Sequence, residues 1–159
     1  MKKIHRYIFV FLISLMATNI NINTVHAKES VWKTVIIKTS RGDRKVYIPN
    51  DLTKRCPQWE PLFKEYELPT EVFSYIAWRE SRCRSIAINA RFDKYGKIVW
   101  TLNKNRTYDS GLLQINSSWR TLTKQVCKTN LEGLLKAKCN VKVASVIYDK
   151  GKGIGNWSL

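Results

Sequence analysis

The sequence predicts an α+β domain that is predominantly helical and contains a small β region. Three segments, 57–67, 70–81 and 141–150, carry apolar residues at helical spacing. Residues 91–116 are polar, with β-prone patches and turn residues, and residues 31–48 are rich in β-branched and aromatic side chains. The chain has 159 residues, which is enough for one domain with its own core but not for two.

Residues 1–27 have the organisation of a secretory signal peptide. "MKKIHR" is basic, "YIFVFLISLMA" is an apolar run of eleven residues, and a polar segment then ends at the small residue Ala27. The apolar run is short for a membrane span, so an uncleaved anchor is the less favoured alternative. We therefore expect a secreted or periplasmic protein.

The chain is strongly basic. Lys2, Lys3 and Arg6 are three of its 28 lysines and arginines, and residues 1–27 hold no acid, so cleavage lowers the formal charge from +16 to +13. A small exported protein with this charge should be attracted to polyanions. Nucleic acid, anionic lipid and a bacterial cell wall with its acidic polymers are the candidates, and charge alone does not choose among them.

Residues 28–50 are predicted to form a β-hairpin or an extended arm. "VWKTVIIKTSRGDRKVYI" places β-prone residues on both sides of the turn sequence "SRGD". Pro49 and Pro57 bracket a segment rich in turn residues, which we interpret as the boundary of the main domain, residues 51–159.

Two disulfides are predicted from four cysteines. All four lie beyond residues 1–27, and an even number of cysteines in an exported chain is typical of disulfides, for which three pairings are possible. We favour Cys56–Cys83 and Cys127–Cys139, the second of which closes a short loop. Zinc is the alternative, but there is no C-x-x-C pair and both histidines fall within residues 1–27. No metal or other cofactor is expected.

The helices of the main domain follow from apolar spacing and from helix-breaking residues. Residues 57–67, "PQWEPLFKEYE", form one helix, which Pro69 ends. "TEVFSYIAWRES", residues 70–81, is the strongest helix. A β-hairpin or irregular sheet is expected over 91–116, and the helix 141–150 ends at the glycines of "GKGIG".

Glu80 is the residue of the 70–81 helix that points to chemistry. Phe73, Ile76 and Ala77 form an apolar stripe, and Glu80 lies two full turns beyond Phe73, on the same face. Burial of a carboxylate beside apolar groups is costly and raises the pKa of the acid. A carboxyl that stays protonated at the edge of a cleft can donate its proton to a leaving oxygen.

A surface ion pair is the alternative interpretation of Glu80. Arg79, Arg82 and Arg84 all lie close to it in sequence. Such an exposed pair would contribute only about 0–1 kcal/mol and would have no chemical role.

The order of three motifs resembles the lysozyme and lytic transglycosylase superfamily. "RES" ends a helix, a β region follows, and "DSGLLQINSSW" occupies residues 109–119. The transglycosylase branch has a third motif, a helix with Ala-Tyr-Asn. "ASVIYDKG" is similar to it, with Tyr148 at the tyrosine and Asp149 in place of the asparagine. The resemblance covers about residues 56–157, and "GLLQINSSW" is its most specific part.

The resemblance implies a lysozyme-like fold with a small β-hairpin region beside a cleft. Glu80 would be the general acid that protonates the glycosidic oxygen between N-acetylmuramic acid and N-acetylglucosamine. Substrate binding would fall to Ser81, Gln114, Asn116, Trp119 and Tyr148. Plain packing is the alternative for each of these residues, weakest for Gln114 and strongest for Trp119.

Asp109 stands where animal-type lysozymes carry a second carboxylate. A carboxyl separation of about 5–5.5 Å would suit a retaining hydrolase, with Asp109 as nucleophile or cation stabiliser. Lytic transglycosylases lack this partner, and their single glutamate acts as acid and then as base to give an anhydro product. A turn cap is the structural alternative for Asp109. The segment "KYGKIVWTLNK" lengthens the β-hairpin before it.

The function expected from these observations is a monomeric, secreted, peptidoglycan-degrading glycosidase. Its partners would be the glycan strands and the anionic bacterial cell envelope. A lytic transglycosylase with 1,6-anhydro products and a catalytically inactive wall-binding protein remain alternatives. A nucleic-acid binder is disfavoured by the signal peptide and the lack of a binding motif. Phage lysis, wall remodelling, assembly of an export apparatus and attack on competitors are all compatible settings.

Overall fold

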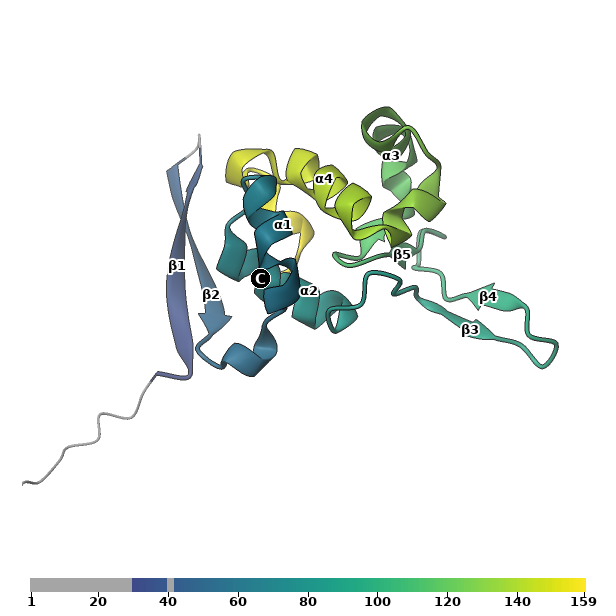
Figure 1. Ribbon diagram of the computed structural model, residues 1–159, viewed down its shortest axis with the longest axis horizontal. Helices are drawn as coiled ribbons and strands as arrows, with labels where there is room; N and C mark the ends of the chain where they lie inside the picture. The colour runs from purple at the N-terminus through teal and green to yellow at the C-terminus, as the bar shows by residue number, and fades with distance from the viewer. Residues whose placement is uncertain (1–29, 40–41) are drawn as a thin grey trace, which may run out of the picture.

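The computed structural model describes residues 30–39 and 42–159, so the predicted signal peptide, 1–27, lies outside the described residues (Figure 1). The described part combines helices with three two-stranded antiparallel sheets, and helical residues outnumber strand residues. The predicted mixture of helices and small antiparallel sheets is thus confirmed. None of the helices in the described part is long and apolar enough to cross a membrane.

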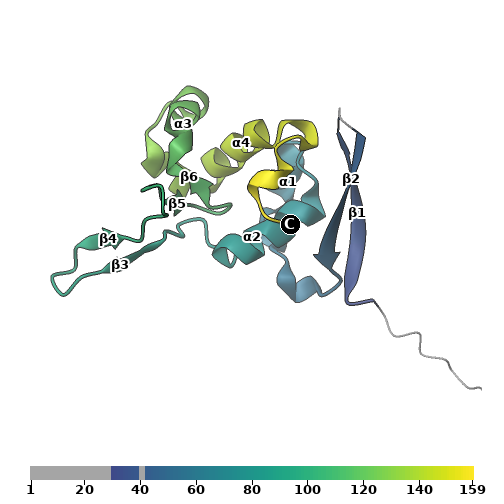
Figure 2. The same ribbon diagram turned by 180° about the vertical axis from the view of Figure 1, so that it is seen from behind.

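An antiparallel hairpin precedes the helices. Strand β1, Trp32–Thr39, pairs along its whole length with β2, Gly42–Pro49. The hairpin flanks the helices on the side opposite to the β3–β4 arm (Figures 1 and 2). Ile37, Val46 and Ile48 are buried in the common core, so one face of the hairpin is part of the packed body.

Glu71 joins this hairpin to the second helix, α2 (Thr70–Ser81). Its Oε1 accepts a hydrogen bond from Lys33 Nζ at 2.6 Å and lies 3.4 Å from Arg55 Nη2. Arg55 is buried and also donates to the backbone carbonyl of Glu71 at 3.1 Å. The hydrogen bond from Lys33, helped by the nearby Arg55 charge, lowers the pKa of Glu71.

Two of the other helices differ from prediction at their ends, and one was not predicted. They are α1 (Glu60–Glu65), α3 (Arg120–Cys127) and α4 (Ala137–Tyr148). The segment predicted as helix 57–67 begins with a 3₁₀ turn before α1. The helix predicted for 141–150 starts earlier and ends at Tyr148, because the next two residues have left-handed backbone angles, with φ of 41° and 51°.

The β region of 91–116 consists of two short hairpins. Strand β3, Ala90–Phe92, pairs with β4, Ile98–Trp100, and this arm projects away from the helices (Figure 1). Strand β5, Asp109–Ser110, pairs with β6, Ile115–Asn116, beside α4. These residues therefore form β-hairpins, as predicted, but the region is divided into a projecting arm, β3–β4, and an inner hairpin, β5–β6.

The core is centred on α2. Phe73 and Ile76 are completely buried, and the Phe73 ring meets Tyr148 edge-on at 5.3 Å and Trp157 at 5.1 Å between centroids. The turn between β5 and β6 contributes Leu112, which is also completely buried. The same packed cluster therefore fixes α2, α4, the β5–β6 turn and the residues after α4, 149–159, which we call the C-terminal segment.

Both disulfides join the pairs that the sequence favoured. Cys56 and Cys83 have their Cα atoms 5.5 Å apart, and Cys127 and Cys139 are separated by 5.7 Å. The first bridge ties the segment before α1 to the end of α2, and the second links α3 to α4. Two disulfides in a chain of this size fit an extracytoplasmic protein.

The contact of Glu71 with Lys33 predicts acid sensitivity of the hairpin. Because folding lowers the pKa of Glu71 below its ordinary value of 4.5, its contribution to stability is present above the pKa of the unfolded chain and is lost as the pH falls through the lower folded value. Glu71→Gln should lower the urea midpoint at pH 6 and match the wild type near pH 3. Glu67→Gln, at an exposed acid, is the control. An equal gap between Glu71→Gln and wild type at both pH values would contradict the prediction.

Candidate functional site

Four of the predicted site residues line a single pocket of about 200 Å³, which we call the motif pocket. They are Asp109, Gln114, Asn116 and Trp119, all from the segment "DSGLLQINSSW". The other walls come from α4 and from the C-terminal segment, which contributes Trp157. Because β5, its turn and β6 fold back on themselves, residues close in sequence face the same space.

The carboxylate of Asp109 is held by two side-chain amides. Its Oδ1 accepts from Asn116 Nδ2 at 2.8 Å, and its Oδ2 accepts from Asn103 Nδ2 at 2.9 Å. Thr107 Oγ1 in turn accepts from the same two amides, at 2.8 and 3.1 Å. Among the described residues no backbone N–H donates to Asp109, so the carboxylate does not cap a turn. It is fixed in direction and remains half-buried at the pocket wall.

Gln114 occupies a backbone conformation that non-glycine residues rarely adopt, with φ of 46°. Its Nε2 donates to the carbonyl of Gly111 at 2.9 Å and to that of Ala87 at 3.2 Å. The amide nitrogen therefore stabilises the turn and links it to the loop after α2. Strain held at a pocket wall is common in functional sites.

Glu80 lies at the end of α2 and is only partly buried, with 27% of its side chain exposed. Its Oε1 accepts from Arg79 Nη2 at 2.7 Å and from Arg79 Nε at 3.2 Å. The apolar stripe of Phe73, Ile76 and Ala77 is completely buried, but it does not extend to Glu80. The helix ends one residue later, at Ser81, and the ion pair with Arg79, which is the alternative interpretation of Glu80, is present.

Arg79 connects Glu80 to the wall of the motif pocket. Its Nη1 donates to the carbonyl of Ser158 at 2.6 Å. The preceding residue, Trp157, lines the pocket and donates from Nε1 to Leu113 O at 3.0 Å. Glu80 does not itself line the pocket, but its neighbour is bound to the segment that does.

Ser81 and Tyr148 do not meet the other predicted site residues. Ser81 is buried, and its hydroxyl donates back to Ala77 O within α2 at 2.9 Å. Tyr148 packs on Phe73 and borders a different cavity beside Tyr66. Burial raises the pKa of Tyr148. The contacts of both residues are those of packed side chains.

Three important residues were not predicted from the sequence. Asn103 donates a hydrogen bond to Asp109, and Trp157 lines the pocket. Asn140 connects the pocket to α4. Asn140 Nδ2 donates to the carbonyls of Ser110 and Leu134, both at 3.0 Å, and its Oδ1 accepts from Leu113 N–H at 2.9 Å. The partners Ser110 and Leu113 of Asn140, and the partner Leu113 of Trp157, are 27 to 44 residues away, so no local motif marks these contacts.

No group of three or more His, Cys, Asp and Glu side chains that could hold a metal ion occurs among the described residues. In comparison with known proteins, no protein-family model and no curated protein matches the chain.

Removal of the Asn140 side chain should release the turn that carries the motif pocket. Asn140→Ala leaves three buried backbone groups without partners, each costing about 1–3 kcal/mol, so the free energy of unfolding should fall by about 3 kcal/mol or more. Urea unfolding at pH 7 measures this change. Asn89→Ala, at an exposed asparagine, should change it by less than about 0.5 kcal/mol. Similar losses in the two variants would refute the anchoring role.

Proposed function

We propose that the protein is a secreted peptidoglycan-cleaving glycosidase with a lysozyme-like fold, acting on the β-1,4 bond between N-acetylmuramic acid and N-acetylglucosamine. The observation that carries the proposal is the convergence of Asp109, Gln114, Asn116 and Trp119 on one pocket. All four residues belong to the single segment "DSGLLQINSSW". Its polar residues line a cavity together with the exposed ring of Trp119, and polar groups beside an aromatic face are the chemistry that binds sugars.

Glu80 is the general acid in this proposal. Both hydrogen bonds from Arg79 are accepted by Oε1, and within the described part of the chain Oε2 accepts none. Oε2 is thus the oxygen that can pass a proton to the glycosidic oxygen once the contact with Arg79 has opened. General acid catalysis by a positioned carboxyl contributes about 10²–10⁴-fold to such a reaction.

Asp109 favours hydrolysis over transglycosylation. Its carboxylate is fixed by Asn103 and Asn116 and faces the motif pocket, where it can stabilise an oxocarbenium-like transition state or attack as a nucleophile. A lytic transglycosylase has no need of this second carboxylate. Hydrolysis leaves reducing ends on the cleaved glycan, whereas transglycosylation leaves 1,6-anhydro ends.

A catalytically inactive wall-binding protein is the second candidate, and the Arg79–Glu80 pair is the observation that favours it. Arg79 donates two hydrogen bonds to Oε1 of Glu80, and charge-assisted hydrogen bonds of this kind are about twice as strong as neutral ones. For Glu80 to act as an acid, this contact has to break when the glycan binds. If it does not break, the pocket would bind wall without cleaving it.

Replacement of Glu80 separates these two candidates. Glu80→Gln keeps the size of the side chain but has no proton to donate at neutral pH, so release of muropeptides from purified wall should fall by about 10²-fold or more. Mass spectrometry of the released fragments gives the rate and the type of end. Glu65→Gln, which removes an equal charge at an exposed site on α1, should release fragments at the wild-type rate. Unchanged release by Glu80→Gln would eliminate Glu80 as the acid.

Salt should weaken activity on intact wall. The predicted mature chain carries a formal charge of +13, and its attraction to anionic wall polymers is screened as the Debye length falls from about 10 Å at 0.1 M salt to about 3 Å at 1 M. Turbidity clearing of wall suspensions should slow over this range. Cleavage of a short uncharged chito-oligosaccharide is the control and should be much less affected. Equal salt dependence of both substrates would show that long-range attraction to the wall is not involved.

A further inference from the structure

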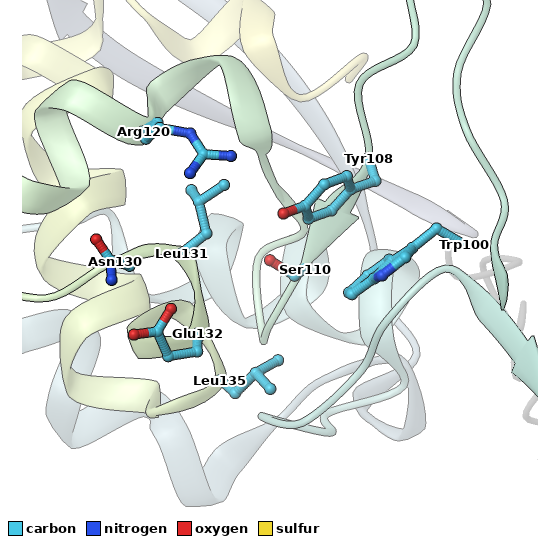
Figure 3. Close-up of a pocket in the computed structure, with 8 residues that line it drawn as sticks. All are labelled: Trp100, Tyr108, Ser110, Arg120, Asn130, Leu131, Glu132 and Leu135. Carbon is cyan, nitrogen blue, oxygen red and sulfur yellow. The ribbon is translucent and has the colours of Figure 1, made fainter. Parts of the chain in front are cut away.

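Strand β5 separates two cavities. Successive side chains of a strand point to opposite faces, so Asp109 faces the motif pocket while Ser110 faces a second cavity of about 420 Å³. We call this second space the Ser110 cavity (Figure 3). Its walls are Trp100, Tyr108, Arg120, Leu131 and Leu135, with Asn130 and Glu132 beside them. Its volume is in the range of small-ligand sites.

Ser110 is the first indication of a ligand. The residue is only 3% exposed, and within the described part of the chain its hydroxyl has no hydrogen-bond partner. Buried hydroxyls in folded proteins are almost always hydrogen-bonded, so an unpaired one requires an explanation. In Figure 3 the hydroxyl points into the space between Tyr108 and Leu131.

Arg120 and Tyr108 supply further donors to the same space. Figure 3 shows the Arg120 guanidinium and the Tyr108 hydroxyl turned toward each other across the Ser110 cavity, with the Ser110 hydroxyl close below. Among the described residues neither group has a hydrogen bond or ion pair through these atoms. A guanidinium with two hydroxyl donors is the arrangement that binds a carboxylate.

The remaining walls suit small aliphatic groups. Trp100 and Tyr108 form an aromatic wall, with ring centroids 4.3 Å apart and planes inclined by 31°. Leu131 and Leu135 line the opposite side. Glu132, next to the leucines, offers an acceptor for an ammonium group. A neutral sugar would use the aromatic wall but would leave both charged residues without a partner.

We propose that the Ser110 cavity binds the carboxylate end of a short peptide with small aliphatic residues and an ammonium-bearing side chain. The chemistry is that of the stem peptides attached to wall glycans, and this identification of the source rests on the proposed function. Arg120, Ser110 and Tyr108 donate to the carboxylate, and methyl groups pack against Trp100 and the leucines. The glycan would then occupy one side of β5 and the peptide the other.

Acetyl-Lys-D-Ala-D-Ala is the probe, and its C-terminal amide is the matched control. Titration of the ¹⁵N-labelled full chain should shift the Trp100 indole N–H and the amides of Ser110 and Leu131, while the amide peptide should bind about tenfold more weakly or worse. Arg120→Gln should weaken acid binding by a similar factor, and Ser110→Ala by a smaller one. Arg44→Gln, which removes a cation from the hairpin, should bind like the wild type. The ligand-side comparison needs no variant and is therefore independent of folding defects.

Equal affinity for acid and amide, or full binding by Arg120→Gln, would overturn the proposal. Saturable shifts of the same signals by a chito-oligosaccharide, without shifts by the peptide, would also overturn it in favour of a glycan subsite. Glu80→Gln should bind the peptide normally. Wall cleavage and peptide binding are therefore measured separately. Failure of the proposed function shows only in the cleavage assay, and failure of the peptide proposal shows only in the titration.

Discussion

The buried carboxamide of Asn140 is the contact on which the arrangement around the motif depends. Strands β5 and β6 have two residues each, which is too short for a hairpin to be stable by itself. Asn140 supplies from α4 the donor and acceptor that this turn lacks, by bonding to Ser110 O and Leu113 N–H. The direction of Asp109, and with it the opposite direction of Ser110, is thus set by a residue of another element.

Gly111 makes this close approach possible. Its φ is +82°, and a Cβ atom added there would lie 2.1 Å from both Asn140 Nδ2 and the carbonyl oxygen of Leu134. A side chain would therefore displace the carboxamide from the turn. The glycine of "DSGLLQIN" has a physical role as definite as those of the polar residues around it, since it admits the anchor that keeps them in place.

The sequence was most informative where one segment contains the whole interaction. The helix 70–81 and the shared pocket of Asp109 and Asn116 follow from local periodicity and from a single tight turn. Helix α3 was not predicted because it is short and mostly polar: only Leu122, Val126 and Cys127 of its eight residues are apolar, although these three pack against the core. Periodicity places Glu80 on the same helix face as Phe73, but it carries no information on how near the end of the helix lies to solvent. It also does not say which neighbouring side chain the carboxylate contacts.

The ion pair beside the proposed acid is constrained at one end. Arg79 Nη1 is bound to the backbone carbonyl of Ser158, and the adjacent Trp157 is buried and bonded to Leu113, so the guanidinium is held by a packed segment. Glu80 is attached to this network only through Arg79 and is partly exposed. If the contact opens when a glycan binds, rotation of Glu80 breaks only its two hydrogen bonds with Arg79. Movement of Arg79 would break the same two bonds and also its hydrogen bond to Ser158 O. The arginine is then best described as a fixed docking point for the resting carboxylate, and the glutamate as the mobile partner.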